Sequence, residues 1–452
     1  MSARSSSEGT RIIFRLKGNR ICPANSWSDQ RNSNLSASRG YWDPPDTPGR
    51  SVNVLQSVPN KVDVVVIGGG VHGASAAYHL VKAGFEVALV EKGSIGSGAS
   101  GVSGGIIRCH YTNEPMIRLA LRAAQRWQGL EAELGRPVGY VQNGMLLMVD
   151  EDDAGVMEEL VARQKRIGVD TEIIEPAQVE RYIPGFRTDG LALGAFERQA
   201  GYADPYATAN AFAARAQELG VHVLVETEVT GIELDGSRVR GVKAGGHSIQ
   251  CRYVVNCAGA WAPRIAAMVG VDLPIKPGTL SMIAVNPRNP AWTRTSPTWV
   301  DMPHMTYCRP DASGLMLAGG GRLENETLTT ETPDPDAPAP RPSDLFEAEM
   351  HDNLVRRCPW AEGMQRVRAW TGIDGHTPDH HLIFGPVPGI DGYLQVAGGG
   401  GNSFKLSPAT GEAVAEYVST RTCTSLDLNA LSITRFQENR LFRGGYRMNL
   451  LG

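Results

Sequence analysis

A glycine turn after a short apolar strand constrains the fold of this sequence more than any other feature. The run from Val64 to Ile67 is β-branched and apolar, which is typical of a strand buried on both faces of a parallel sheet. Gly68, Gly70 and Gly73 follow in the pattern G-x-G-x-x-G and open a helical stretch. The first glycine permits a tight turn, the second lets the backbone approach a pyrophosphate, and the third lets the helix pack closely on the strand.

A second strand completes this unit and ends on an acid. Residues 87–90 are apolar, and Glu91 lies twenty-three residues after Gly68. A carboxylate at about this position accepts hydrogen bonds from a ribose in dinucleotide-binding units. Strand, turn, helix, strand and acid together therefore predict a dinucleotide site, in preference to a βαβ unit that binds nothing.

Composition limits the remaining possibilities. The 452 residues are 42% hydrophobic, enough for two domains or one large two-lobed domain, and the net charge of −4 gives no electrostatic case for nucleic acid or an anionic membrane. Seven scattered cysteines without a C-x-x-C pair indicate neither a disulfide framework nor a zinc site. No apolar run approaches the roughly 18 residues of a membrane span. We expect a cytoplasmic protein, with an organelle transit peptide as the weaker alternative because the first residues are rich in Arg and Ser.

The rest of the chain offers several local signals. Residues 1–60 lack periodicity and are expected to be a disordered extension. Asp204 and Pro205 mark a helix start, and HSIQCRYVVN (247–256) is expected to form one strand. Leu345, Phe346, Met350 and Leu354 share one face of an expected amphipathic helix, so we assign all four to the core.

Two glycine-rich loops are candidates for ligand contact. Residues 93–105 follow Glu91 directly and carry few bulky side chains, which suits close approach to a large ligand better than an ordinary flexible connection. Residues 398–401 are four consecutive glycines between a strand and a helix that starts near Pro408. Bare backbone and a helix N-terminus at a second place in the chain indicate a ligand larger than a mononucleotide.

Five motifs in order, DVVVIGGGVHGASAAYHL, GSGAS, GGIIR, VVNCAGAW and AGGGGNSFKLSPATGE, resemble the D-amino-acid oxidase superfamily of FAD-dependent oxidoreductases. Within it the sarcosine oxidases of monomeric and β-subunit type are most similar. The resemblance covers residues 61 to 436 and implies an α/β fold, with an α+β substrate lobe. It implies a Rossmann-like FAD-binding domain built from residues 61–111, 198–268 and 365–421. Residues 112–197 and 269–364 would form an antiparallel-sheet substrate domain, and 422–452 a C-terminal tail.

The motifs and the resemblance together give the expected site residues. Glu91 would bind the adenosine ribose, Val229 would lie near the adenine, and the glycine run would face the flavin ring. The full set of expected cofactor-binding residues is Gly68, Gly70, Gly73, Glu91, Lys92, Ser97, Gly98, Ala99, Ser100, Val229, Ala258, Gly259, Trp261, Gly399, Gly400, Gly401, Asn402 and Lys405.

By the same resemblance, Arg108 and Lys405 hold the substrate carboxylate and are the expected catalytic residues. A guanidinium offers a bidentate fork and an ammonium a point charge, although either cation alone is more often a surface residue. The expected reaction is oxidation of the C–N bond of a small amino acid or N-methylated amino acid, with O₂ or another electron acceptor. The alternatives are a non-catalytic flavoprotein subunit and a hydroxy-acid oxidoreductase. Oligomerisation is possible.

Two departures from the sarcosine oxidase pattern and two further observations qualify this expectation. Gly372 stands where the monomeric enzymes carry the cysteine bonded to flavin, which excludes a bond there. Met316 is aligned with an oxygen-activating lysine, so the acceptor need not be O₂. Cys109 and His110 could carry a covalent flavin, but unlinked side chains are expected. The histidines at 376, 380 and 381 match a metal cluster in composition only, and we assign no metal.

Overall fold

A computed structural model describes residues 58–320 and 334–447 of the chain. The expected N-terminal extension falls almost entirely outside these residues. Within them, no helix combines the length and apolar character required to cross a membrane.

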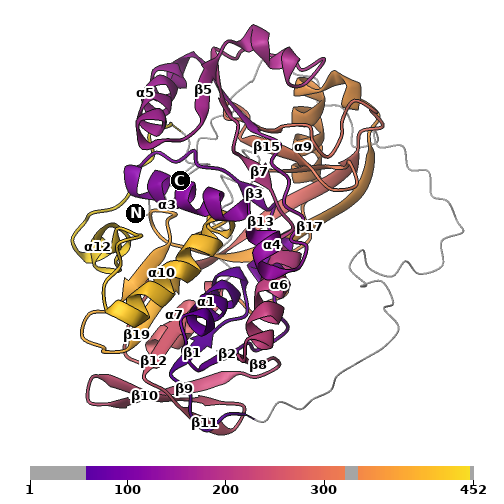
Figure 1. The fold of residues 1–452 in the computed structure, drawn as a ribbon. Coiled ribbons are helices and arrows are strands. Elements are labelled where there is room, and N and C mark those ends of the chain that lie inside the picture. The colour runs from indigo at the N-terminus through magenta and orange to yellow at the C-terminus, as the bar shows by residue number, and fades with distance from the viewer. Residues whose placement is uncertain (1–57, 321–333, 448–452) are drawn as a thin grey trace, which may run out of the picture.

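A six-stranded sheet forms the centre of one half of the molecule, the lower half in Figure 1. Its order is β18-β19-β12-β1-β2-β8, and all neighbours are parallel except the β18-β19 pair. The strands are β1 (Val64–Ile67), β2 (Val87–Val90), β8 (His222–Leu224), β12 (Tyr253–Asn256), β18 (Ile383–Pro386) and β19 (Tyr393–Ala397). The predicted α/β fold class is confirmed.

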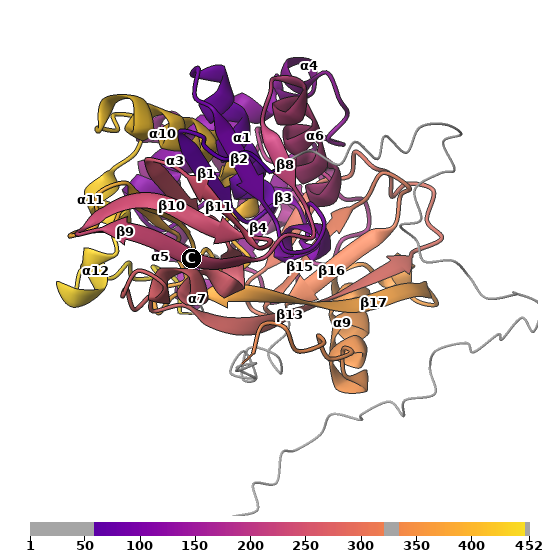
Figure 2. The ribbon, with the colours of Figure 1, turned by 90° about the horizontal axis from the view of Figure 1, so that it is seen from below.

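Strand β1 is buried on both faces, as its sequence predicts. Val64 and Val66 pack into a cluster with the helices α1 (Val71–Lys82), α6 (Pro205–Glu218) and α10 (Ser407–Thr420). The alternate residues Val65 and Ile67 pack on the opposite face against a three-stranded sheet. Its strands are β9 (Val229–Asp235), β10 (Arg238–Ala244) and β11 (His247–Gln250), which Figure 2 shows in front.

An eight-stranded, mostly antiparallel sheet forms the other half, in the order β17-β13-β16-β15-β14-β4-β6-β5. The strands are β4 (Met145–Val149), β5 (Thr171–Ile174), β6 (Leu193–Glu197), β13 (Lys276–Asn286), β14 (Thr298–Asp301), β15 (Thr306–Pro310), β16 (Met316–Gly320) and β17 (Gln365–His376). Helix α9 (Asp344–Arg357) packs on one face and α5 (Glu151–Ile167) on the other. The long strands β13 and β17 run toward the six-stranded half (Figures 1 and 2).

Several other helices and a pair of short strands complete these parts of the described chain. They are α2 (Ala99–Val102), the paired strands β3 (Ile106–Ile107) and β7 (Gly201–Tyr202), α3 (Glu114–Trp127), α4 (Leu130–Leu134) and α7 (Ala262–Ala267). Residues 113 and 204 cap α3 and α6 through their side chains, because Asn113 Oδ1 accepts from the Met116 amide and Asp204 Oδ1 from the Ala207 amide. Helix α3 packs with α10 in the cluster of the six-stranded half, although we expected residues 112–197 in the other domain.

Three local expectations differ from the structure. Residues 247–256 form two strands in different sheets, because the chain turns at Cys251 and Arg252 between β11 and β12. Strand β17 pairs with β13 in the eight-stranded sheet, whereas we had placed residues 365–376 in the FAD-binding domain. Leu345 is 69% exposed, so our assignment of this residue to the core was wrong; Phe346, Met350 and Leu354 are fully buried as predicted. Leu345 lies one residue from Phe346 and therefore on a different side of the helix.

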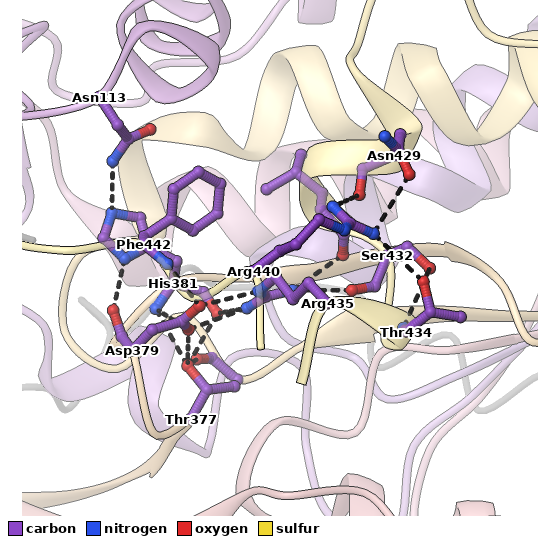
Figure 3. Close-up of polar contacts among 12 residues, drawn as sticks. Asn113, Thr377, Asp379, His381, Asn429, Ser432, Thr434, Arg435, Arg440 and Phe442 are labelled. Atoms are coloured by element: carbon purple, nitrogen blue, oxygen red, sulfur yellow. Dashed lines mark hydrogen bonds and ion pairs between the residues drawn. The ribbon is translucent and has the colours of Figure 1, made fainter. Parts of the chain in front are cut away.

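The C-terminal segment packs against the body of the molecule. It contains α11 (Leu428–Leu431) and α12 (Thr434–Gln437), and Arg435 of α12 forms a fully buried ion pair with Asp379, with Nε 2.8 Å from Oδ2. Arg435 also donates to the carbonyl of His381, whose ring lies 4.6 Å from that of Phe442 (Figure 3). Removing one partner of such a pair leaves an uncompensated buried charge, so loss of either side chain would destabilise the packing of this segment.

The contact between α1 and β1 gives a direct test of the fold. A Cβ on Gly73 would lie 1.9 Å from the Gly68 carbonyl oxygen, so we expect Gly73→Ala to lower the free energy of unfolding by about 3 kcal/mol. Gly155 in α5 has no atom within 4 Å of an added Cβ, and Gly155→Ala should stabilise by about 0.5–1 kcal/mol. Urea denaturation measures both; equal stability of Gly73→Ala and the unsubstituted protein would contradict the close packing.

Candidate functional site

The turn between β1 and α1 forms a cradle of bare backbone. Gly68 has a φ of +106°, a conformation that disfavours any other residue, and its Cβ would collide with the Cys257 carbonyl oxygen at 2.5 Å. A Cβ on Gly70 would meet only Ser100 Oγ, at 3.3 Å. Ser100 in turn accepts a hydrogen bond from the Val71 amide at 3.0 Å. The loop at 93–105 is thereby tied to the start of α1.

Glu91 closes the other side of this turn. Its Oε2 accepts from the Gly69 amide at 2.6 Å and its Oε1 from the Gly93 amide at 2.7 Å. Each carboxylate oxygen has a second lone pair, so both retain the capacity to accept from a ligand hydroxyl. The geometry suits the ribose contact that we expect for this residue.

A cavity of about 480 Å³ extends from Glu91 past the cradle to the second glycine run. We call it the cofactor cavity. Its walls include fourteen of the expected cofactor-binding residues, namely Gly68, Gly70, Glu91, Lys92, Ser97, Gly98, Ala99, Ser100, Val229, Ala258, Gly259, Trp261, Gly399 and Gly401. The other four, Gly73, Gly400, Asn402 and Lys405, are not among the described residues that line the cavity. A cavity that runs from Glu91 to the second glycine run, with the bare backbone of the first glycine turn along its wall, fits a dinucleotide cofactor.

A cluster of charged and aromatic side chains stands at the Glu91 end of this cavity. Asp336, from the connection between β16 and α9, accepts from Lys92 Nζ, from Trp261 Nε1 at 2.8 Å and from Arg264 Nη1 at 2.7 Å. The Lys92 ammonium also lies 4.1 Å from the centre of a Trp261 ring. Hydrogen bonds, chiefly from Lys92, lower the pKa of Asp336 to about 2. These contacts hold a segment from the eight-stranded half against the cofactor cavity.

The glycine run at 398–401 turns the chain sharply at the end of the cofactor cavity opposite to Glu91. Gly398, Gly400 and Gly401 all have positive φ angles, and a Cβ on Gly399 would overlap Ser403 Cβ at 2.2 Å. The 3₁₀ turn Phe404–Leu406 and then α10 follow directly. This turn brings the backbone to the cavity wall and places the N-terminal end of α10 behind it.

Arg108 and Lys405 meet at Asn402. Arg108 Nη2 donates to Asn402 Oδ1 at 3.0 Å, and Lys405 Nζ donates to the Asn402 carbonyl at 2.6 Å. Both cations also lie over the ring of Tyr111, at 4.6 and 5.2 Å from its centre. The structure therefore brings together two residues that are 297 positions apart in the sequence.

Burial controls the ionisation of this cluster. Desolvation lowers the pKa of Arg108, and desolvation together with the Arg108 charge lowers the pKa of Lys405 well below its ordinary value. The carboxyl of Glu197, which accepts from the Cys109 amide at 2.7 Å, has its pKa raised to about 7 by burial. An anion that entered this region would be attracted by the charges of both cations.

The candidate covalent residues lie away from the cofactor cavity. Cys109 Sγ accepts a hydrogen bond from Gln199 at 3.1 Å, and His110 Nε2 is 2.7 Å from the hydroxyl of Tyr446. Both residues are buried and neither is part of the cavity wall as the described residues define it. This placement favours an unlinked cofactor.

The structure shows the surroundings of Gly372 and Met316, the two positions that we aligned with functional residues of the sarcosine oxidases. A Cβ on Gly372 would lie 2.3 Å from Val102 Cγ2, so a side chain at this position would require Val102 to move. Met316 is fully buried in the cluster that contains Phe346 of α9, and it is not among the described residues that line the cofactor cavity. No conclusion about O₂ follows from Met316.

Sequence reasoning missed several charged residues that line the cavities, among them Asp336, Asp374 and Arg309. Asp336 and Asp374 line the cofactor cavity, and Arg309 lines a second cavity of about 340 Å³ that shares Ser103 with the first. Arg309 is buried and its pKa is lowered by desolvation. Within residues 58–320 and 334–447, no group of three metal-ligating side chains is arranged around a common point.

The Asp336 contacts predict slow release of the expected cofactor, FAD. An exposed ion pair contributes up to about 1 kcal/mol, so loss of three contacts in Asp336→Ala should speed FAD dissociation roughly tenfold, and added salt should shrink the difference. Asp170→Ala, which breaks an exposed pair with Arg198 elsewhere, is the matched control. Stopped-flow recovery of flavin fluorescence measures the rate. An unchanged rate in Asp336→Ala would show that this segment does not retain the cofactor.

Comparisons with known proteins agree with this geometry. Residues 63–417 match the DAO family, described as FAD dependent oxidoreductase. The chain is 29% identical to sarcosine oxidase subunit beta of Rhodobacter capsulatus, over 79% of this chain and 85% of that protein. It is 27% identical to FAD-dependent oxidoreductase domain-containing protein 1 of Xenopus laevis, over 84% and 83%. The crystal structure of L-proline dehydrogenase from P. horikoshii matches 85% of this chain and 100% of its own, at 28% identity and a TM-score of 0.78. The chain therefore belongs to the DAO family and is an FAD-dependent oxidoreductase.

Proposed function

We propose that this enzyme oxidises the C–N bond of a small amino acid, of the secondary or N-methylated type, with FAD as its cofactor. The observation that carries the proposal is the convergence of two buried cations, Arg108 and Lys405, on Asn402. Asn402 directly follows Gly401, which lines the cofactor cavity. A carboxylate held by these cations would have its α-carbon close to the flavin end of the cavity.

The names of similar proteins support this choice of chemistry. Sarcosine oxidase subunit beta, glycine oxidase of Geobacillus kaustophilus and the L-proline dehydrogenase are all named for reactions of amino acids. Two of these three amino acids, sarcosine and proline, have a secondary amine. The proposal extends this shared substrate class to the present chain.

The residues of this chain would bind the substrate and position it. Arg108 can offer two parallel hydrogen bonds to a carboxylate, and Lys405 a single point charge. FAD would supply the redox chemistry as the acceptor of a hydride equivalent from a carbon bonded to the amine nitrogen. The amine would first lose a proton, so that its lone pair can form the C=N bond, and water would then hydrolyse the imine. The bulk of Tyr111 beneath both cations excludes water from their inner side, which strengthens their attraction for an anion.

Substitution of Arg108 tests the carboxylate contact. Arg108→Met should weaken binding of a carboxylate-bearing amine by about 2–5 kcal/mol, while reduction by a matching amine without the carboxylate should change little. Arg108→Lys should recover only part of the loss, because an ammonium cannot reproduce the fork of a guanidinium. Anaerobic stopped-flow reduction of the flavin gives the apparent Kd of each amine.

Arg309→Met is the companion variant, because Arg309 is the buried guanidinium of the second cavity. The proposal expects this variant to keep its preference for carboxylate substrates. If Arg309→Met loses that preference and Arg108→Met keeps it, the carboxylate is held in the second cavity. Equal losses on charged and neutral amines in Arg108→Met would mean that Arg108 supports loop structure.

A further inference from the structure

Asp374 places a carboxylate at the flavin end of the cofactor cavity. It lies near the end of β17 and lines the cavity beside Ile373, within the same wall as Gly399 and Gly401. The other carboxylates of the wall, Glu91, Glu228 and Asp336, come from the segments that form the opposite end. Asp374 is half-buried, so its charge is only partly screened by solvent.

The direction of the Asp374 side chain follows from the strand. Alternate residues of a strand share a face, so Asp374 is on the same side of β17 as Gly372 and Trp370. Trp370 Nε1 donates to the Val102 carbonyl at 3.0 Å, and a Cβ on Gly372 would touch Val102. This side of β17 therefore faces α2 and the cavity.

The Asp374 carboxylate is held by backbone amides and not by a cation. Oδ1 accepts from the Gly375 amide at 2.7 Å, and Oδ2 accepts from the Gly401 amide. Among the residues that the structure describes, no Lys, Arg or His nitrogen is recorded within 4.0 Å of this carboxylate, whereas Asp336 pairs with both Lys92 and Arg264. Each oxygen of Asp374 uses one lone pair and keeps another for a ligand.

Two consecutive residues of one loop thus bond to groups of opposite charge, a carboxylate and a pair of cations. The Gly401 amide is bonded to Asp374, and the next residue, Asn402, is bonded to Arg108 and Lys405. A free amino acid at neutral pH carries a carboxylate and a protonated amine on the same carbon. A ligand with that charge pattern matches the arrangement of the loop.

We propose that Asp374 binds the protonated amine of the substrate, and this inference rests on the proposed function. The consequence is a specificity for amino acids whose nitrogen carries a positive charge and an N–H. Hydroxy acids and N-acylated amino acids lack that charge and would leave the Asp374 carboxylate without a partner. Asp374 is a positioning residue in this account: it orients the C–N bond that the reaction oxidises.

The test compares two probes that differ at one atom. N-Methylglycine carries the protonated amine, and (methylthio)acetate replaces the nitrogen by an uncharged sulfur. Asp374→Asn should raise the apparent Kd of N-methylglycine at least tenfold, measured by anaerobic flavin reduction, and leave the Kd of (methylthio)acetate within about twofold, measured by perturbation of the flavin absorbance. Asp374→Glu keeps the charge and should recover part of the loss.

Asp63→Asn is the matched control, because it removes a half-buried carboxylate that also accepts from a backbone amide, that of Glu86, but lies outside the wall of the cofactor cavity. It should leave the affinities for both probes unchanged. Equal weakening of both probes in Asp374→Asn, or no change in either, would overturn the inference. So would a changed flavin spectrum or weaker FAD binding in ligand-free Asp374→Asn, since the carboxylate would then serve the cofactor. If the unsubstituted enzyme responds to neither probe nor to other amino acids, the proposed function fails first and the inference fails with it.

Discussion

The close contact between the start of α1 and the end of β1 is the constraint on which the rest of the molecule depends. Gly73 lets α1 approach the Gly68 carbonyl, and this approach brings the bare turn at Gly70 to the cavity surface. The same turn leaves the Gly69 amide free to bond Glu91, which fixes the end of β2. The absence of a side chain at Gly73 therefore sets the positions of helix α1, strand β2 and Glu91 around the cofactor cavity.

The two halves of the molecule contribute unequally along the cavity. The six-stranded half supplies the glycine turns and Glu91, whereas Asp336 and Asp374 come from segments of the eight-stranded half. Charged side chains from that half therefore stand at both ends of the cavity. A cofactor in the cavity would therefore contact both halves of the molecule. Its binding would stabilise their relative arrangement.

The sequence predicted those parts of the structure that depend on local chemistry. The buried strand, the glycine turn and the helix cap at Asp204 all follow from residues close to one another in the chain. The sequence did not predict Asp336 or Asp374 as cavity residues, because their roles depend on where β16 and β17 lie in the eight-stranded sheet. The error at Leu345 arose because adjacent residues of a helix lie on different sides, and the apolar pattern alone did not show whether Leu345 or its neighbour Phe346 faces the core.

Anaerobic addition of amines to the FAD-loaded enzyme tests the central claim most directly. Flavin absorbance near its long-wavelength maximum is recorded after addition of a panel of secondary and N-methylated amino acids, the matching amines without a carboxylate, and the matching hydroxy acids. The account predicts bleaching by at least one secondary or N-methylated amino acid, with much weaker responses to its decarboxylated and hydroxy counterparts. Bleaching by the hydroxy acids in preference to the amino acids, or no bleaching by any member of the panel, would contradict it.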